Sequence, residues 1–372
     1  MSDNGSSTPL GRLSQLGQSV WVDFISREAL ENGELERMVR EDAVVGLTSN
    51  PTIFQKAIAS GHHYDDQLRE ILEHEEDGGE VFLELAVTDI QNAADMLRPI
   101  WDEGSGRDGY VSLEVDPTLA HDAEGTAQAA RRIWDLVDRP NLLVKIPGTK
   151  DGLQAIEDSI AGGISINVTL LFSLERHAEV CDAYVRGLER LVESGGDPSK
   201  VASVASFFVS RVDTEIDNRL DEIGGHDELK GKAAIANAKL AYQTYRDKFA
   251  GDRWQALADK GATPQRALWA STSTKNPDYR DVVYVEELIG PDTVNTMPVE
   301  TIEAFQDHGE VANTLEEDVD EAKKVFDDLK DVGVDMQDVG RTLEREGVEK
   351  FAKSFEELLQ DVKQKRDALA AA

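Results

Sequence analysis

The feature that most constrains the fold of this chain is a set of short apolar segments that alternate with segments of helical periodicity. Eight segments have the length and composition of buried strands. They lie at residues 19–25, 44–50, 110–116, 142–146, 164–171, 201–209, 266–271 and 293–297. Most are followed by a helical stretch, and this alternation is typical of a parallel sheet whose helices cover its faces.

Eight is the number of strands at which a β/α sheet closes into a barrel, so we predict an α/β protein with the (β/α)8 or TIM-barrel fold. No linker rich in Pro, Gly or Ser divides the 372 residues. We expect a flexible lead-in over residues 1–17, a catalytic barrel over 18–300, and a helical extension over 301–372 that packs on the barrel. Extra helices are therefore expected at both ends of the barrel, and residues 213–249 are expected to form one long helical stretch.

Nearly every predicted strand carries a polar residue among apolar neighbours. In a barrel, such side chains point into the interior or gather at the carboxyl-terminal mouth, where barrel enzymes do their chemistry. One such residue is ordinary, but seven strands that share the feature indicate a common polar site. These residues are Asp23, Asn50, Glu114, Lys145, Asn167, Thr169, Ser206 and Ser271.

Lys145 most needs an explanation, because it lies in the apolar run Leu142–Ile146, which is closed by Pro147. Taken alone, a lysine there would be expected on an edge strand or with its ammonium group extended to the surface. Burial disfavours the charged form of a lysine, and a neutral amine is a nucleophile toward a carbonyl group. Because the other strands supply carboxylates and amides, we interpret Lys145 as a functional nucleophile.

The charge of the chain limits its partners. Its 73 Asp and Glu residues outnumber 39 Lys and Arg residues, which gives a net charge of -34. Nucleic acids and anionic membranes need a basic surface, so we expect neither as a partner. The acidic excess is spread along the whole chain, and we hypothesise a salt-loving (halophile) host with an acidic proteome. No secretory signal or membrane span is visible, so we expect a cytoplasmic monomer or homodimer.

Motifs for other kinds of site are weak. There is no Gly-x-Gly-x-x-Gly after a strand, and Gly231-Lys232 lacks the Ser or Thr that would complete a phosphate-binding loop. His62 and His63 with Asp65 could suggest a metal, but no further ligand has a suitable spacing. We therefore expect neither a metal ion nor an organic cofactor.

Six motifs, taken together and in this order, resemble the transaldolase family in its longer bacterial subfamily. They are Val22-Asp23, Gly46-Leu-Thr-Ser-Asn-Pro51, Ser112-Leu-Glu-Val-Asp116, Val144-Lys-Ile-Pro-Gly-Thr149, Ile166-Asn-Val-Thr-Leu-Leu-Phe-Ser173 and Phe207-Phe-Val-Ser-Arg211. The resemblance implies a class I aldolase-type barrel of the pentose phosphate pathway. Such an enzyme moves a dihydroxyacetone unit from sedoheptulose 7-phosphate or fructose 6-phosphate to glyceraldehyde 3-phosphate or erythrose 4-phosphate, without a cofactor.

The resemblance also implies catalytic roles. Lys145 matches the lysine that forms the Schiff base, and Asp23 matches the acid/base that deprotonates the C4 hydroxyl group. Glu114 matches the acid/base that works with Thr169 through a water molecule when the carbinolamine forms.

Substrate binding is implied for a further set of residues. Asn50, Asn167 and Ser206 match contacts to the dihydroxyacetone unit, and Arg211 matches an arginine that binds phosphate, a role suited to a planar guanidinium. Where the family often has a second arginine for phosphate, this chain has Ser271 and Lys275.

Two other functions stay open. One is a fructose 6-phosphate aldolase on the same barrel, which would release free dihydroxyacetone. Such aldolases tend to carry glutamine and tyrosine where this chain has Glu114 and Phe208, so these two residues favour transfer. The other is a catalytically silent barrel that binds sugar phosphates. The loss of Lys145, Asp23 or Glu114 would have favoured the silent barrel, and all three are present.

Overall fold

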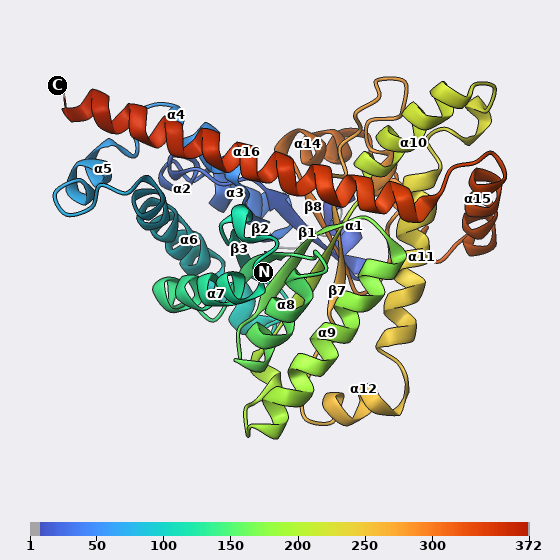
Figure 1. The fold of residues 1–372 in the computed structure, drawn as a ribbon, viewed down its shortest axis with the longest axis horizontal. Helices are drawn as coiled ribbons and strands as arrows, with labels where there is room; N and C mark the ends of the chain where they lie inside the picture. Colours follow the sequence, from blue (N-terminus) through green and yellow to red (C-terminus); the bar gives the residue numbers. More distant parts are fainter. Residues whose placement is uncertain (1–7, 371–372) are drawn as a thin grey trace.

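The computed structural model describes residues 8–370 and confirms the predicted barrel. Its parallel strands form one closed sheet in chain order, and the last strand pairs with the first (Figure 1). The strands are β1 (Gln18–Asp23), β2 (Val44–Thr48), β3 (Tyr110–Glu114), β4 (Leu142–Pro147), β5 (Ile166–Leu171), β6 (Ser203–Phe208), β7 (Arg266–Ala270) and β8 (Thr293–Met297). All positions of β3 to β8 are buried, as expected for strands with a packed barrel interior on one side and helices on the other.

Helices connect the strands and cover the outside of the barrel. Ser26 and Ser173 cap two of them, because each hydroxyl accepts a hydrogen bond from a backbone N–H of the first helical turn. The helices are α2 (Arg27–Glu31), α3 (Glu34–Glu41), α4 (Pro51–Ala59), α5 (Asp65–Ile71), α6 (Gly78–Glu103), α7 (Ala123–Val137), α8 (Gly152–Ala161), α9 (Leu174–Glu193), α10 (Ser210–Ile223), α11 (Ala233–Lys248), α12 (Gly251–Ala258), α13 (Val283–Glu286) and α14 (Val299–His308).

Two local predictions were wrong. Residues 213–249 do not form one helix: α10 and α11 are separate, because Gly224 and Gly225 have φ values of 80° and 85° that end α10. The structure has the expected extra amino-terminal helix, α1 (Pro9–Gln15), but this helix lies inside the lead-in predicted to be flexible, and its Leu10 and Leu13 are fully buried. Residues 1–7 of that lead-in lie outside the described part of the chain.

Helices α15 (Val319–Asp331) and α16 (Met336–Ala370) follow the barrel. Helix α16 is 35 residues long and runs as the red ribbon across the top of the view in Figure 1. Two of its glycines allow a close approach to the barrel. A Cβ atom at Gly340 would lie 2.8 Å from Cβ of Ser173, and one at Gly347 would lie 3.0 Å from Cδ2 of Leu170.

The amino-terminal end of the barrel is closed by a satisfied polar network. The Arg266 guanidinium pairs with Asp108 at 3.0 Å and donates to Ser19 Oγ at 2.8 Å. Ser19 also donates to Asp108, and so does the indole N–H of Trp21. Because these buried polar groups have partners, we interpret this end as a structural plug.

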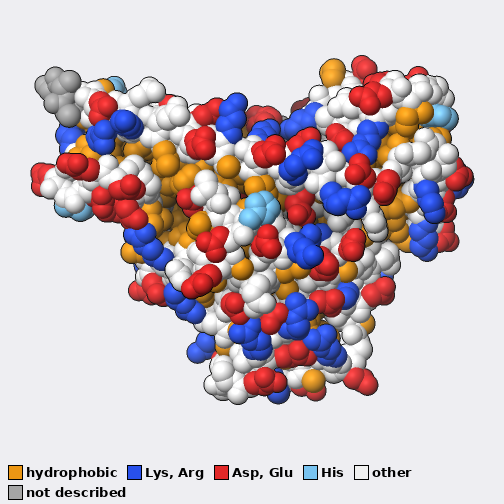
Figure 2. All heavy atoms as spheres, viewed as in Figure 1, with side chains coloured by type: hydrophobic (Ala, Val, Ile, Leu, Met, Phe, Trp, Pro, Cys, Tyr) orange, Lys and Arg blue, Asp and Glu red, His pale blue; other side chains and the backbone are white. Residues whose placement is uncertain are grey.

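The surface carries both signs of charge. Figure 2 shows acidic and basic side chains interspersed over one face, with no continuous basic area there. Among residues 8–370, no helix combines the length and the apolar character needed to cross a membrane.

Candidate active site

The polar strand residues converge at the carboxyl-terminal mouth of the barrel. They surround a cavity of about 330 Å³. Nine predicted residues line it: Asp23, Asn50, Lys145, Thr169, Ser206, Phe208, Arg211, Ser271 and Lys275. The other two, Glu114 and Asn167, contact members of that lining, so the structure brings the whole predicted set together.

Lys145 lies inside the barrel, with 5% of its surface exposed. Its Nζ donates a hydrogen bond of 2.8 Å to the carbonyl oxygen of Ser49 and lies 3.5 Å from Oε2 of Glu114. The register of the sheet explains this contact, since Lys145 of β4 lies opposite Glu114 of β3 and Asn167 of β5. The amine therefore has a carboxylate beside it that can exchange a proton with it.

Glu114 and Thr169 present unsatisfied polar atoms. Both carboxylate oxygens of Glu114 and the hydroxyl of Thr169 are buried and have no hydrogen-bond partner in the described structure. Burial raises the pKa of Glu114, and the neighbouring Lys145 opposes that rise. Buried polar atoms in proteins almost always have partners, so these atoms indicate a place for a water molecule or a substrate hydroxyl group.

Asp23, at the end of β1, is held by a chain of hydroxyl groups. Its Oδ1 accepts a hydrogen bond of 2.7 Å from Thr48 of β2, and the Thr48 hydroxyl lies 2.7 Å from that of Thr296 in β8. Burial raises the pKa of Asp23, while the charge of Lys145 lowers it. Asp23 is thus a fixed carboxyl group with a proton affinity above that of an exposed aspartate, as suits an acid/base.

Two non-glycine residues beside the site have a left-handed backbone. Leu170 has φ 60° and follows Thr169, where the pairing of β5 with β6 shifts register. Ser271 has φ 57° and follows β7. Backbone strain of this kind clusters at functional sites; here it occurs at Ser271, a predicted site residue, and next to Thr169, another one.

Another part of the cavity lining is positively charged. The Arg211 guanidinium carbon lies 5.3 Å from the ring centre of Phe208 and 5.9 Å from that of Phe351. Burial lowers the pKa of Arg211, which makes no ion pair within residues 8–370. Lys275 lines the same space, and its Nζ donates to Ser273 Oγ at 2.7 Å. A partly buried, unpaired guanidinium with an ammonium nearby suits a phosphate group.

Comparison with known proteins agrees with this geometry. The profile of the family described as "Transaldolase/Fructose-6-phosphate aldolase" matches residues 20–362. The transaldolase of Frankia alni is 54% identical over 361 residues, which cover 96% of this chain and 97% of that protein. The transaldolase of Mycobacterium tuberculosis is 50% identical over 365 residues, with 97% and 98% covered. The chain belongs to the transaldolase family.

Sequence reasoning missed several residues of this transaldolase-family site. Thr48 and Thr296 are polar residues in apolar strands and carried the same signal as the residues that were found. Lys56 of α4, and Lys350 and Phe351 of α16, also line the cavity. They lie on helices, so the pattern of polar residues in strands could not reveal them.

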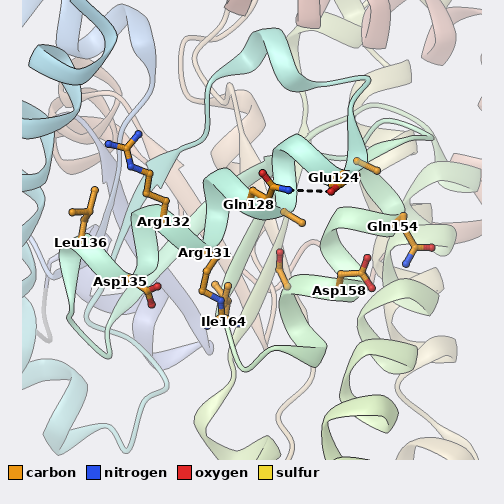
Figure 3. Close-up of a pocket in the computed structure, with 12 residues that line it drawn as sticks. Glu124, Gln128, Arg131, Arg132, Asp135, Leu136, Gln154, Asp158 and Ile164 are labelled. Atoms are coloured by element: carbon orange, nitrogen blue, oxygen red, sulfur yellow. Dashed lines mark hydrogen bonds between the residues drawn. The ribbon is translucent and has the colours of Figure 1, made fainter. Parts of the chain in front are cut away.

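A larger hollow on the outside of the barrel is not the transaldolase-family site. Its volume is about 810 Å³, and residues of α7 and α8 form most of it (Figure 3). Exposed side chains such as Gln128, Arg131 and Leu136 line it, and it includes no polar strand residue. Since barrel enzymes react at the carboxyl ends of their strands, we assign the active site to the smaller cavity.

The histidine loop that could suggest a metal has other partners. His62 Nδ1 lies 2.7 Å from Asp65, and His63 Nδ1 lies 2.8 Å from Glu31. Across residues 8–370, no three His, Cys, Asp or Glu side chains are grouped so that they could hold a metal ion.

Proposed function

We propose that this site transfers a dihydroxyacetone unit from a ketose phosphate to an aldose phosphate through a Schiff base on Lys145. The observation that carries the proposal is a buried lysine amine 3.5 Å from a buried carboxylate, in a chain of the transaldolase family. The expected donors are sedoheptulose 7-phosphate and fructose 6-phosphate, and the expected acceptors are glyceraldehyde 3-phosphate and erythrose 4-phosphate. This reaction belongs to the pentose phosphate pathway, and we propose that it takes place in the cytoplasm.

Schiff-base formation begins when the neutral amine of Lys145 adds to the C2 carbonyl carbon of the donor. The resulting carbinolamine loses water and becomes an iminium ion. Glu114 first takes the proton whose loss leaves the Lys145 amine neutral, and it later takes a second proton from the attacking nitrogen. It passes both protons to the former carbonyl oxygen, which leaves as water, so the step balances. The unpartnered Thr169 hydroxyl supports this assignment, because it can hold the water molecule that relays these protons.

Cleavage follows from the electron demand of the iminium ion. Asp23 takes the proton of the C4 hydroxyl group, the C3–C4 bond breaks, and its electron pair moves into the iminium to form an enamine. The first aldose leaves as C4 becomes a carbonyl carbon. The acceptor then reverses these events: enamine C3 attacks its aldehyde carbon, and Asp23 returns the proton to the new hydroxyl group. Hydrolysis of the new iminium frees the product and Lys145.

The amide side chains are suited to hold the dihydroxyacetone unit. Asn50 caps α4 by accepting a hydrogen bond from the Ile53 N–H at 3.1 Å, which leaves its Nδ2 group available to donate to the substrate. Asn167 donates to Ser112 Oγ at 3.1 Å and accepts from Ser206 Oγ at 2.6 Å. These contacts fix the orientation of both amides before substrate binds, so little ordering remains to be done on binding.

A substitution at Phe208 can distinguish transfer from simple aldol cleavage. The wild type with fructose 6-phosphate alone should release dihydroxyacetone slowly, because a phenyl ring offers no group to help protonate the enamine. Added erythrose 4-phosphate should give rapid formation of sedoheptulose 7-phosphate. Phe208→Tyr should shift the ratio toward release. The measurement is the rate of dihydroxyacetone release divided by the rate of transfer.

The matched control for this change is Phe172→Tyr. Phe172 packs 5.2 Å from Phe208, ring centre to ring centre, but does not line the cavity. A phenol there should leave the ratio of release to transfer at its wild-type value. If the wild type frees dihydroxyacetone as fast without acceptor as it transfers it with one, the chain is an aldolase and the proposed transfer is wrong.

We also propose that the acidic surface is adapted to a salt-rich, halophile-type cytoplasm. The net charge of -34 produces self-repulsion that dissolved ions screen. The melting temperature should therefore rise between low and molar KCl. Thermal melts in a KCl series test this, and a flat or falling melting temperature would remove the proposal without affecting the enzymatic one.

A further inference from the structure

Four cationic side chains face the active-site cavity without a carboxylate partner. They are Lys56, Arg211, Lys275 and Lys350, and none makes an ion pair within residues 8–370. Acidic residues outnumber basic ones almost two to one in this chain, so unpaired cations gathered at one cavity are unexpected. Two of the four, Lys56 and Lys350, have no role in the proposed chemistry.

Arg211, Lys275 and Lys350 lie close enough to perturb one another. The charge of Arg211 is the largest cause that lowers the pKa of Lys350, and partial burial adds to it. Burial lowers the pKa of Lys275 most, and the charge of Arg211 lowers it further. The charge of Glu300 opposes this lowering, and Lys350 adds a smaller lowering. Like charges held together raise the free energy of the empty protein, so the cluster indicates a site for a multiply charged anion.

Helix α16 brings Lys350 to this place. The next residue, Phe351, is buried and packs its ring against the Arg211 guanidinium at 5.9 Å. One turn earlier, Gly347 lets the helix approach Leu170. One turn later, Ser354 Oγ accepts a hydrogen bond of 3.1 Å from Thr52 of α4. These neighbours fix the backbone of α16 at Lys350, whose own side chain is exposed at the rim of the cavity.

The far end of α16 is fixed to α4 as well. Lys365 Nζ donates to the carbonyl oxygens of Ile58 and Gly61, at 3.0 and 2.9 Å, and pairs with Asp65 at 3.1 Å. Gln55 donates to Asp361 at 3.0 Å. These contacts hold the helix without any contribution from Lys350, so the lysine is not needed to dock it.

We propose that Lys350 is a third cationic ligand of the substrate phosphate, beside Arg211 and Lys275, and that the C-terminal helix thereby completes the phosphate site. The proposal rests on the proposed transfer reaction and deepens it. A phosphate monoester carries about -1.5 to -2 charge at neutral pH and offers three strong acceptor oxygens, so three cationic donors can each bind one oxygen. Lys350 would therefore favour phosphorylated over unphosphorylated sugars.

Lys350→Gln tests this against the control Lys353→Gln. Lys353 lies on the same helix, is exposed, does not line the cavity, and forms an ion pair with Glu357 at 3.8 Å. The readout is kcat/KM for glyceraldehyde 3-phosphate divided by kcat/KM for unphosphorylated glyceraldehyde, with one common donor. Lys350→Gln should lower this ratio about tenfold, the usual effect of losing one charge-assisted hydrogen bond. Lys350→Arg should restore most of the ratio, and Lys353→Gln should leave it unchanged.

Thermal melts provide a second readout that a structural role would not give. In phosphate-free buffer, Lys350→Gln should melt at the wild-type temperature or above, because it removes like-charge repulsion and breaks no contact. Inorganic phosphate should then stabilise the variant less than the wild type. A wild-type selectivity ratio in Lys350→Gln, or an equal gain from phosphate, would overturn the proposal. If the wild type transfers nothing, the proposed function fails, while the phosphate melts still decide the role of Lys350.

Discussion

Lys145→Arg is expected to fold and to lose transfer activity by at least about 1,000-fold, the scale on which loss of a catalytic nucleophile acts. A guanidinium stays protonated at any working pH and cannot add to a carbonyl carbon. The positive charge beside Glu114 is kept, so the loss is chemical and not electrostatic. The measurement is formation of sedoheptulose 7-phosphate from fructose 6-phosphate and erythrose 4-phosphate.

The matched control is Lys150→Arg. Lys150 follows β4 by three residues and is exposed, so its replacement should not change the rate. Transfer by Lys145→Arg within tenfold of the wild type would mean that the amine is not the nucleophile. Circular dichroism and a thermal melt would show that the variant is folded.

Asp23→Asn is expected to lower the transfer rate by about 100- to 10,000-fold, the usual contribution of a general acid/base. An amide cannot take the proton of the C4 hydroxyl group, so the C3–C4 bond should stay intact. Attack by Lys145 does not need Asp23, and the Schiff base should still form. Borohydride reduction with fructose 6-phosphate should therefore trap the whole six-carbon sugar phosphate on the variant. A dihydroxyacetone adduct on Asp23→Asn would show that another group is the base.

The stability of Asp23→Asn has a predictable sign. Because burial raises the pKa of Asp23, the folded protein binds this proton more tightly than the unfolded chain does. The stability linked to protonated Asp23 is fully present below the pKa of Asp23 in the unfolded chain, and it is lost as the pH rises through the pKa in the folded protein. At neutral pH, ionised Asp23 therefore reduces the stability. A neutral asparagine removes that cost, so the variant should melt at or above the wild-type temperature at neutral pH.

The strands and most of the site could be predicted from sequence for the same reason. A strand buried on both faces reads as a continuous apolar run, so a polar residue within it stands out. Closure of the barrel in chain order then brings the ends of all strands to one mouth. That is why Asp23 and Lys145, from different strands, line one cavity.

What the sequence did not reveal depends on tertiary packing. Helix α1 is too short to be stable alone, and the burial of its two leucines against the rest of the protein stabilises it. Lys350 lies on a long helix. The amphipathic pattern of this helix indicates that one face packs against the protein, but not which part of the protein that face contacts. Gly347 permits the close approach of α16 to Leu170, and contacts such as that of Ser354 with Thr52 hold the helix in place; only the folded chain shows them.

Borohydride reduction with fructose 6-phosphate, followed by mass spectrometry of the peptides, tests the Schiff-base assignment most directly. The account predicts a dihydroxyacetone adduct on Lys145 of the wild type and none on Lys145→Arg. A wild type that carries the adduct on Lys150 or Lys275, or that carries none, would contradict it.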